Sequence, residues 1–246
     1  MLAAVILAAG QGTRMKSDLP KVLHPLGDST LIDRVISIAR SADPNKVILV
    51  VGSGMERIIA HLRSEKVIFT VQMEQRGTAH AVECASAPLT GFEGEVAVLC
   101  GDMPLIRPET LQSLLEHHRE EEAAATVLTG ILEDPAKYGR IVRGDGNRIE
   151  RIVEFADASP EIREIKEINS GAYIFEKEKL FSAIEAIDDD NAQGEFYLPD
   201  AVEILVSRGE KVLAHPAEDS TEVMGVNTPE QLAEAERVLA ERRSSE

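Results

Sequence analysis

The chain has 246 residues, of which 43% are hydrophobic and only 4% aromatic, and its formal net charge at pH 7 is −17. This length is enough for one domain with a full core, and the acidic surface disfavours binding to DNA, RNA or anionic membranes. Because Trp is absent and aromatic side chains are few, a surface that stacks nucleic-acid bases is disfavoured as well.

The first apolar run, residues 3–7, is expected to form a buried strand. It leads into residues 8–12, a loop of small residues with two glycines, whose backbone can approach a ligand closely. Amides of such a loop form a cradle for anionic oxygens. Arg14 and Lys21 add positive charge near it, although on charge alone a chance cluster is the alternative. We expect this loop to hold the phosphates of a nucleotide.

Strands and helices alternate through the first half of the chain. Strands are expected at 46–51, 67–71 and 96–100, and helices after Asp28-Ser29-Thr30, around 58–62, over 78–87 and over 108–123. This order predicts right-handed βαβ units and a parallel sheet, in which ligands bind outside the carboxyl ends of the strands. Gly101-Asp102-Met103-Pro104 follows one such strand directly. We expect His117-His118 to lie at a solvated helix end.

The second half of the chain is expected to combine a hairpin with further strands and helices. Strands are expected at 125–132, 168–175 and 212–215, a hairpin at 140–142 and 148–154 around Gly144-Asp145-Gly146-Asn147, and helices over 177–187 and around 198–205. Thr228-Pro229-Glu230-Gln231 has the pattern of a capping box at the start of a last helix, which is expected to fray after residue 242. These elements predict a single α/β domain over residues 1–246.

The opening loop does not match the better-known phosphate loops. It lacks the Walker pattern, and Met15 stands where a dinucleotide fingerprint has its third glycine. The second strand ends in Gly52-Ser53 rather than in an acidic residue for a ribose, which disfavours a dehydrogenase. Gly52-Ser53-Gly54 is also not a nucleophile elbow, which excludes a serine hydrolase of that kind. The cations favour a triphosphate or a pyrophosphate product.

Several polar residues allow both a functional and a structural interpretation. Asp102, at a strand end beside the loop, suits Mg²⁺, or it starts a turn. Gln72 can read a pyrimidine edge, or it is a loop residue before a helix capped by Thr78. Glu154 and Asn169 can hold sugar hydroxyls, or they are polar strand ends.

The cysteines and the first residues indicate the compartment. Cys84 and Cys100 lie in apolar contexts without metal-ligand spacing, so we expect both to be reduced. Met1 to Ala9 imitates a signal-peptide core but has no positive region before it. No run reaches transmembrane length, and we expect a cytoplasmic protein.

An ordered set of motifs then points to one family. The set comprises Leu7-Ala8-Ala9-Gly10-x-Gly12-Thr13-Arg14-Met15, Leu19-Pro20-Lys21-Val22-Leu23, Gln72-x-x-x-x-Gly77-Thr78-x-His80-Ala81, Gly101-Asp102-x-Pro104, Tyr138-Gly139-Arg140-Ile141, Ile152-Val153-Glu154, Glu167-Ile168-Asn169-Ser170-Gly171, Asn191-Ala192-Gln193-Gly194-Glu195-Phe196-Tyr197-Leu198 and Gly225-Val226-Asn227. It resembles the nucleotide-sugar pyrophosphorylases and, more closely, the uridyltransferase domain of the bifunctional N-acetylglucosamine-1-phosphate enzymes. The resemblance covers nearly the whole chain.

This resemblance implies a Rossmann-like three-layer nucleotidyltransferase fold with a mostly parallel, mixed central sheet. It implies a nucleotide-binding half over about 1–124 and a sugar-binding half over about 125–246. The residues that it assigns to the nucleotide are Leu7, Ala8, Ala9, Gly10, Gly12, Thr13, Gln72, Gly77, Thr78 and Gly101. It assigns Arg14 and Lys21 to the phosphates as catalytic residues. It assigns Gly139, Glu154 and Asn169 to N-acetylglucosamine. The residues that it assigns to Mg²⁺ are Asp102 and Asn227.

The implied reaction is the Mg²⁺-dependent transfer of UMP from UTP to N-acetylglucosamine 1-phosphate, with UDP-N-acetylglucosamine and pyrophosphate as products and no nucleic-acid or membrane partner. Two substitutions depart from the family pattern: Cys100 stands where Tyr is common, and Ala79 where Gly is frequent. The family's usual left-handed β-helix acetyltransferase domain has no counterpart in these residues, so we expect no acetyl-CoA chemistry from them. A transferase for another sugar 1-phosphate or NTP, and a non-catalytic nucleotide-sugar sensor, are the alternatives.

Overall fold

The structure, a computed structural model, describes residues 1–52, 54–146 and 148–245. Three residues lie outside this part: Ser53, Asn147 and Glu246. They were predicted to lie in the segment after the second strand, in the hairpin turn and in the frayed end, respectively, and these predictions lie outside the described residues.

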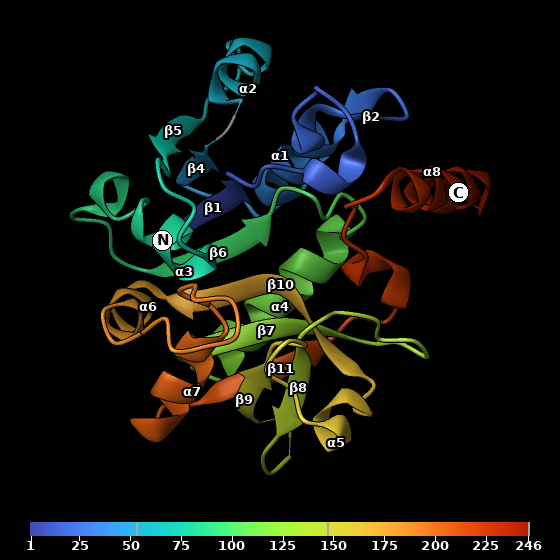
Figure 1. Cartoon of the computed structure of the whole chain (residues 1–246). Helices are drawn as coiled ribbons and strands as arrows, with labels where there is room; N and C mark the ends of the chain where they lie inside the picture. Colours follow the sequence, from blue (N-terminus) through green and yellow to red (C-terminus); the bar gives the residue numbers. More distant parts are fainter. Residues whose placement is uncertain (53, 147, 246) are drawn as a thin grey trace.

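Among the described residues, nine strands form one central sheet (Figure 1). Its main path runs in the order β11-β7-β10-β6-β1-β4-β5, and β8 and β9 extend it beside β10. The strands are β1 Leu2–Ala8, β4 Lys46–Val51, β5 Ile68–Val71, β6 Glu95–Cys100, β7 Ala125–Ile131, β8 Arg140–Arg143, β9 Ile149–Val153, β10 Glu167–Glu176 and β11 Val212–Pro216. A separate two-stranded sheet joins β2 Pro25–Leu26 to β3 Ser29–Thr30.

The sheet is mixed but mostly parallel, as predicted. β1 pairs in parallel with β4 and β6, β4 with β5, and β7 with β11. Only β10 on the main path is reversed, between β6 and β7. The chain leaves β1 toward β4 and β5 and returns on the other side to β6. The end of β1 is therefore a topological switch point, where open α/β sheets bind their ligands.

Helices cover both faces of the sheet (Figure 1). They are α1 Leu31–Ser41, α2 Met55–His61, α3 Thr78–Glu83, α4 Pro108–Glu120, α5 Pro160–Arg163, α6 Lys177–Ile184, α7 Asp200–Ser207 and α8 Pro229–Ser245, with short 3-10 turns η1 Thr13–Met15, η2 Lys21–Leu23, η3 Ala87–Leu89 and η4 Ser220–Val223. Helix α8 continues through residues where fraying was expected, and α3 ends earlier than the predicted helix over 78–87.

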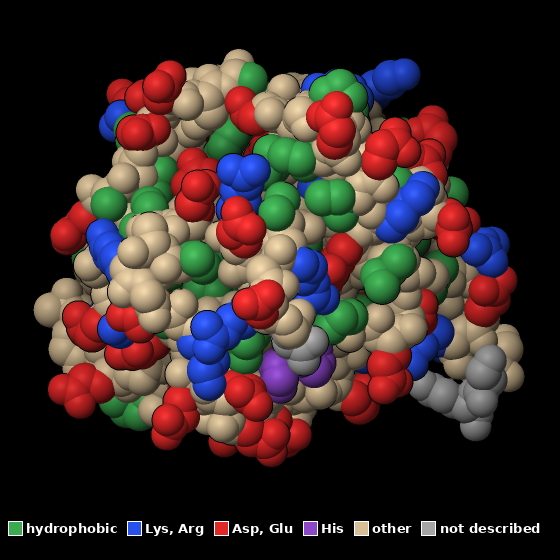
Figure 2. Space-filling model, turned by 90° about the horizontal axis from the view of Figure 1, so that it is seen from below, with side chains coloured by type: hydrophobic (Ala, Val, Ile, Leu, Met, Phe, Trp, Pro, Cys, Tyr) green, Lys and Arg blue, Asp and Glu red, His purple; other side chains and the backbone are tan. Residues whose placement is uncertain are grey.

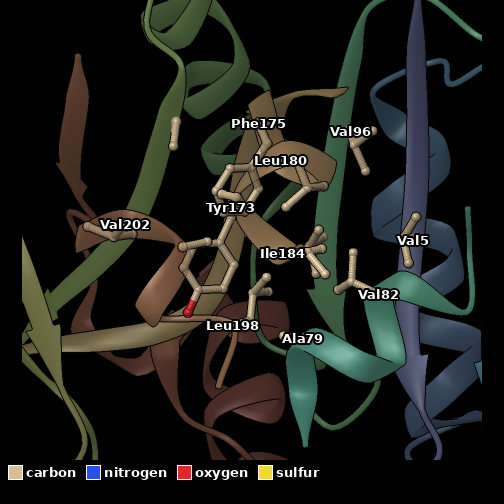
Figure 3. Packing of buried hydrophobic residues seen from close by; sticks show 14 of the residues in the cluster. Val5, Ala79, Val82, Val96, Tyr173, Phe175, Leu180, Ile184, Leu198 and Val202 are labelled. Carbon is tan, nitrogen blue, oxygen red and sulfur yellow. The ribbon is translucent and has the colours of Figure 1, made fainter. Parts of the chain in front are cut away.

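Alternate side chains of β1 enter two different cores. Ala3 and Val5 belong to the core beneath α3, α6 and α7, and Figure 3 shows Val5 on the same side as Val82 of α3 and Ile184 of α6. The intervening side chains, such as Ile6, enter the opposite core with α1 and α4. Burial on both faces explains why this strand reads as a continuous apolar run.

The first helix begins where the sequence predicted. The Thr30 side chain accepts a hydrogen bond from the Asp33 backbone N–H, and the Asp33 carboxylate accepts one from the Thr30 backbone N–H. These reciprocal bonds satisfy two otherwise unpaired donors of the helix end.

The expectation of a solvated His117-His118 pair was wrong for His118. His118 is 4% exposed, and its Nδ1 lies 2.9 Å from Thr126 Oγ1. Its burial lowers its pKa to about 4. His118 follows Leu111, Leu114 and Leu115 at helical spacing, so it lies on the buried stripe of α4.

The surface reflects the strong negative charge. The view from below shows acidic side chains spread over the whole face, with smaller groups of Lys and Arg between them (Figure 2). Within the described residues, every helix is too short or too polar to span a membrane. The cytoplasmic location and the division into a nucleotide and a sugar half stay predictions.

Candidate active site

The loop after β1 is shaped by close backbone packing. The N–H of Gly101 donates to the carbonyl of Leu7 over 2.9 Å, which joins the ends of β1 and β6. Gly12 has φ +64°, and a Cβ placed there would lie 2.6 Å from Cβ of Lys21. The glycine therefore allows the loop to turn and lets Lys21 pack directly against it.

Both predicted cations and both predicted metal ligands meet in one charged cluster. Lys21 Nζ lies 2.5 Å from Asp102 Oδ2 and 2.9 Å from Asn227 Oδ1. Arg14 Nη2 donates to the same Asn227 oxygen over 3.0 Å. The Lys21 and Asp102 side chains are only 14% and 18% exposed. The fold thus gathers residues from η1 and η2 after the opening loop, from the end of β6 and from the segment before α8.

Backbone contacts hold the two oxygen donors in place. The N–H of Val226 donates to the Asp102 carbonyl over 2.8 Å, which ties the two segments together. The Gln231 side chain accepts a 2.8 Å bond from the Asn227 N–H, and Thr228 Oγ1 accepts a 3.3 Å bond from the Gln231 N–H. The capping box was predicted at the right residues, but its glutamine contacts Asn227 rather than the N-cap itself.

A pocket of about 280 Å³ lies along the opening loop. Its lining includes seven predicted nucleotide residues: Leu7, Ala8, Ala9, Gly10, Gln72, Gly77 and Thr78. Lys21 and Asp102 line it as well. The remaining predicted nucleotide residues, Gly12, Thr13 and Gly101, do not line it and lie in the surrounding loops.

The wall of this pocket depends on Gly77 and Thr78. Gly77 has φ +112°, and a Cβ there would lie 2.4 Å from the carbonyl oxygen of Phe196. Thr78 Oγ1 accepts a 2.9 Å hydrogen bond from the Leu198 N–H, and the Phe196 carbonyl accepts a bond from the Ala79 N–H. The start of α3 and residues 196–198 are therefore joined closely, which a larger residue than glycine would prevent.

A second pocket of about 210 Å³ is lined by all three predicted sugar residues, Gly139, Glu154 and Asn169. Burial raises the pKa of Glu154 to about 7, with further contributions from Asp200 and Asp157. A Cβ on Gly139 would lie 3.0 Å from Glu154 Oε1, so glycine leaves room for this carboxyl group.

Asn169 is already partnered inside the protein. Its Nδ2 donates to the Tyr173 hydroxyl over 2.7 Å, and its Oδ1 accepts from the Gly171 N–H over 3.1 Å. An amide side chain can form about four hydrogen bonds, so one donor and one acceptor position remain.

The two pockets meet. Leu7, Thr78 and Cys100 line both. Cys100 is a free thiol, as is Cys84, and its burial raises its pKa to about 12. Cys100 is therefore a neutral wall residue between the pockets.

Sequence reasoning missed Gln75 and gave no role to Tyr138 and Arg140, which stand in one of the motifs, although all three support the site. Gln75 Nε2 donates to the Ala9 carbonyl over 2.5 Å, and the Tyr138 hydroxyl accepts from the Gly225 N–H over 3.1 Å. Arg140, 2% exposed, donates to the carbonyls of Ala136 and Tyr138 and thereby fixes the loop before Gly139. A buried arginine cannot be recognised from a strand pattern, because its partners are backbone atoms.

Among the described residues, no group of three or more His, Cys, Asp or Glu side chains could hold a metal ion by itself. The donor set of Asp102 and Asn227 is nevertheless suited to a hard cation that shares its ligands with a substrate. Both oxygens already converge on one cationic atom, Lys21 Nζ.

The chain matches the family model of the MobA-like NTP transferase domain over residues 4–196. The bifunctional protein GlmU of Geobacter metallireducens is 51% identical over 98% of this chain and 51% of its own length. GlmU of Listeria monocytogenes serotype 4b is 47% identical over 97% of this chain and 52% of its own. The chain thus spans about half the length of the curated relatives it matches.

Solved structures show the same fold. A UDP-glucose pyrophosphorylase complexed with UDP-glucose superposes with a TM-score of 0.78 at 22% identity, over 98% of each chain. A putative glucose-1-phosphate thymidylyltransferase from Bacillus anthracis gives 0.78 at 20% identity, over 97% of this chain and 95% of that one. The predicted Rossmann-like nucleotidyltransferase fold is confirmed.

Proposed function

Because the chain belongs to the MobA-like NTP transferase domain family, we propose that it transfers UMP from UTP to N-acetylglucosamine 1-phosphate, giving UDP-N-acetylglucosamine and pyrophosphate. The relatives of about 50% identity, named bifunctional protein GlmU, support this choice of substrates. The product is a sugar nucleotide of the kind used to build cell-wall polymers.

One observation carries the proposal. Two pockets share the wall formed by Leu7, Thr78 and Cys100, and Lys21 and Asp102 line one of them. A transfer between a nucleotide and a sugar phosphate needs two adjoining binding sites with positive charge near their junction. Holding both reactants in one geometry removes much of the entropic barrier to their reaction.

In the proposed reaction a phosphate oxygen of the sugar phosphate attacks the α-phosphorus of UTP in line, and pyrophosphate leaves. The attacking oxygen is already anionic, so no strong general base is required. Lys21 and Arg14 would stabilise the negative charge that builds up on the phosphates. Their positions in the charged cluster support this role, because both point at one oxygen of Asn227.

We further propose Mg²⁺ as the cofactor, held by Asp102 and Asn227. When bound, Mg²⁺ would neutralise charge on the phosphates of substrate and product. Lys21 now occupies the space between the two oxygens, 2.5 Å and 2.9 Å away. Its flexible stem lets the ammonium move toward a phosphate once another cation shares these oxygens.

On the sugar side, Glu154, Gly139 and Asn169 would position the N-acetylglucosamine ring. Glu154 has a pKa of about 7, so it can accept a hydrogen bond from a hydroxyl when ionised and donate one when protonated. Asn169 retains one donor and one acceptor position for the ligand.

The test measures pyrophosphate release from a panel of four NTPs and several sugar 1-phosphates in Mg²⁺. UTP with N-acetylglucosamine 1-phosphate is expected to give the highest kcat/KM. Release from another pair, with none from this one, would refute the substrate assignment. Tight binding of UDP-N-acetylglucosamine with no turnover of any pair would show a sensor instead.

Two variants test the metal assignment in the same assay. Asp102→Asn is expected to lower the rate in limiting Mg²⁺ by about 10²- to 10³-fold, the usual cost of removing a charge contact at a reacting phosphate. Asp190→Asn, at an exposed position after α6, is the matched control and should retain the wild-type rate. A near-normal rate for Asp102→Asn would show that the charge of Asp102 makes no contact that the transfer needs.

A further inference from the structure

We propose that His80 is a positioning residue that fixes the amide of Gln72, so that Gln72 Oε1 faces the nucleotide base and selects bases with an N–H on the ring edge. The inference rests on the proposed function of the pocket along the opening loop. It adds His80, which lies outside the base contact, to the selection of uracil, since uracil carries such an N–H at N3 and cytosine has a bare acceptor there.

Gln72 is held rigidly at the end of β5. Its backbone N–H donates to the Val51 carbonyl over 2.8 Å, and the residue is 4% exposed. Its side-chain Nε2 lies 2.9 Å from the Gly77 carbonyl oxygen and 3.2 Å from Nδ1 of His80. Two separate groups of the next helix start thus contact the same amide nitrogen.

The orientation of this amide follows from chemistry. A carbonyl oxygen can only accept, so the atom 2.9 Å from the Gly77 oxygen must be the NH₂ group. The reverse orientation would oppose two acceptors. The second N–H then points at His80 Nδ1, which must accept, and the imidazole proton therefore lies on Nε2. That nitrogen is 4.0 Å from Cys84 Sγ, a weak acceptor.

Both donors of Gln72 are consequently used inside the protein. Its Oε1 has no hydrogen-bond partner among the described residues, and the side chain lines the pocket beside Gly77 and Thr78. An acceptor in the wall of a pocket that has no protein partner is available to a donor of the ligand. Uracil N3–H supplies one, whereas N3 of cytosine would oppose a second acceptor, and such unpaired polar contacts are what sites use to reject an analogue.

His80 matters because it holds one of the two N–H groups. Without an acceptor at this position the amide keeps only the Gly77 bond, and rotation that exposes the NH₂ group to the base becomes easier. The preference for UTP over CTP should then fall, while the pocket itself stays in place. A residue with a merely structural role would lower activity with both nucleotides alike.

The experiment compares kcat/KM for UTP and for CTP in the wild type, in His80→Phe, which keeps a ring but has no acceptor, and in His80→Asn, which restores one. His117→Leu on α4, outside the pocket, is the matched control. The UTP:CTP ratio is expected to fall about three- to tenfold in His80→Phe, the effect of about one hydrogen bond, and to stay close to the wild-type ratio in His80→Asn.

Calorimetric affinities for UTP and CTP give the same ratio without turnover. If the wild type turns over no pair of substrates, the proposed function fails. The ratio of the affinities for UTP and CTP then tests the role of His80 by itself. An unchanged ratio in His80→Phe, or an equal loss in His80→Phe and His80→Asn, overturns the inference. Thermal unfolding of each variant shows that it is folded, and His80→Leu replaces His80→Phe if the latter is not.

Discussion

The carboxyl group of Glu154 should make the stability of this protein depend on pH in a direction opposite to that of most carboxylates. Burial raises its pKa from 4.5 to about 7, and Asp200 and Asp157 add to the effect. Between these two pH values the folded state binds a proton that the unfolded state has lost. The contribution of Glu154 to stability is therefore complete below pH 4.5 and is lost as the pH rises through about 7.

The size of this effect follows from the two pKa values. The difference between 4.5 and about 7 corresponds to about 3 kcal/mol of destabilisation once the group is ionised. Glu154→Gln removes the charge but keeps the shape. The difference in unfolding free energy between Glu154→Gln and wild type should therefore grow by about 3 kcal/mol from pH 4.5 to pH 8, or by about 6–12 °C in Tm for a domain of this size.

Urea unfolding at a series of pH values measures this difference directly. Asp200, whose own pKa is raised to about 6 by burial and by neighbouring carboxylates, also interacts with Glu154, so the measured difference belongs to this coupled pair. Glu93→Gln, at an exposed position, is the control and should follow the wild-type curve. Parallel curves for Glu154→Gln and wild type across this range would refute the reasoning.

Two further substitutions test the walls of the site. Gly77→Ala should destabilise the protein by about 1–3 kcal/mol more than the control Gly91→Ala in urea unfolding. Both glycines have positive φ, but only an alanine at position 77 would place its Cβ against the Phe196 carbonyl. Equal losses of stability would mean that this contact is easily relieved. Tyr138→Phe leaves the Gly225 N–H without its acceptor, so Tm should fall by about 2–4 °C, and an unchanged Tm by calorimetry would show that this bond contributes nothing.

The order of elements could be read from local patterns. The strand at 46–51 has the predicted bounds, and α1 begins directly after Asp28-Ser29-Thr30, which was the expected helix start. Such signals depend on near neighbours in the chain, which is why they succeed. The burial of His118 could have been predicted from the sequence, because its spacing from Leu111 and Leu115 places it on the buried stripe of α4.

The contacts between distant segments could not be read in this way. The reversed strand β10 lies between β6 and β7, although no alternation in the chain indicates its direction. The motifs indicated Gln72 as a candidate. The orientation that leaves its Oε1 without a protein partner, however, is set by His80 and by the Gly77 carbonyl, whose positions beside Gln72 are determined by the fold. The roles proposed for the site residues stay predictions until the assays are done.

The distance along the chain between the members of the charged cluster has a consequence for biosynthesis. Lys21 and Asp102 are separated by 81 residues, and Lys21 and Asn227 by 206. A ribosome makes the chain from its N-terminus at about 5–20 residues per second. Lys21 and Asp102 can therefore pair seconds before Asn227 exists, and a nascent chain holds an incomplete site until the residues before α8 have been added.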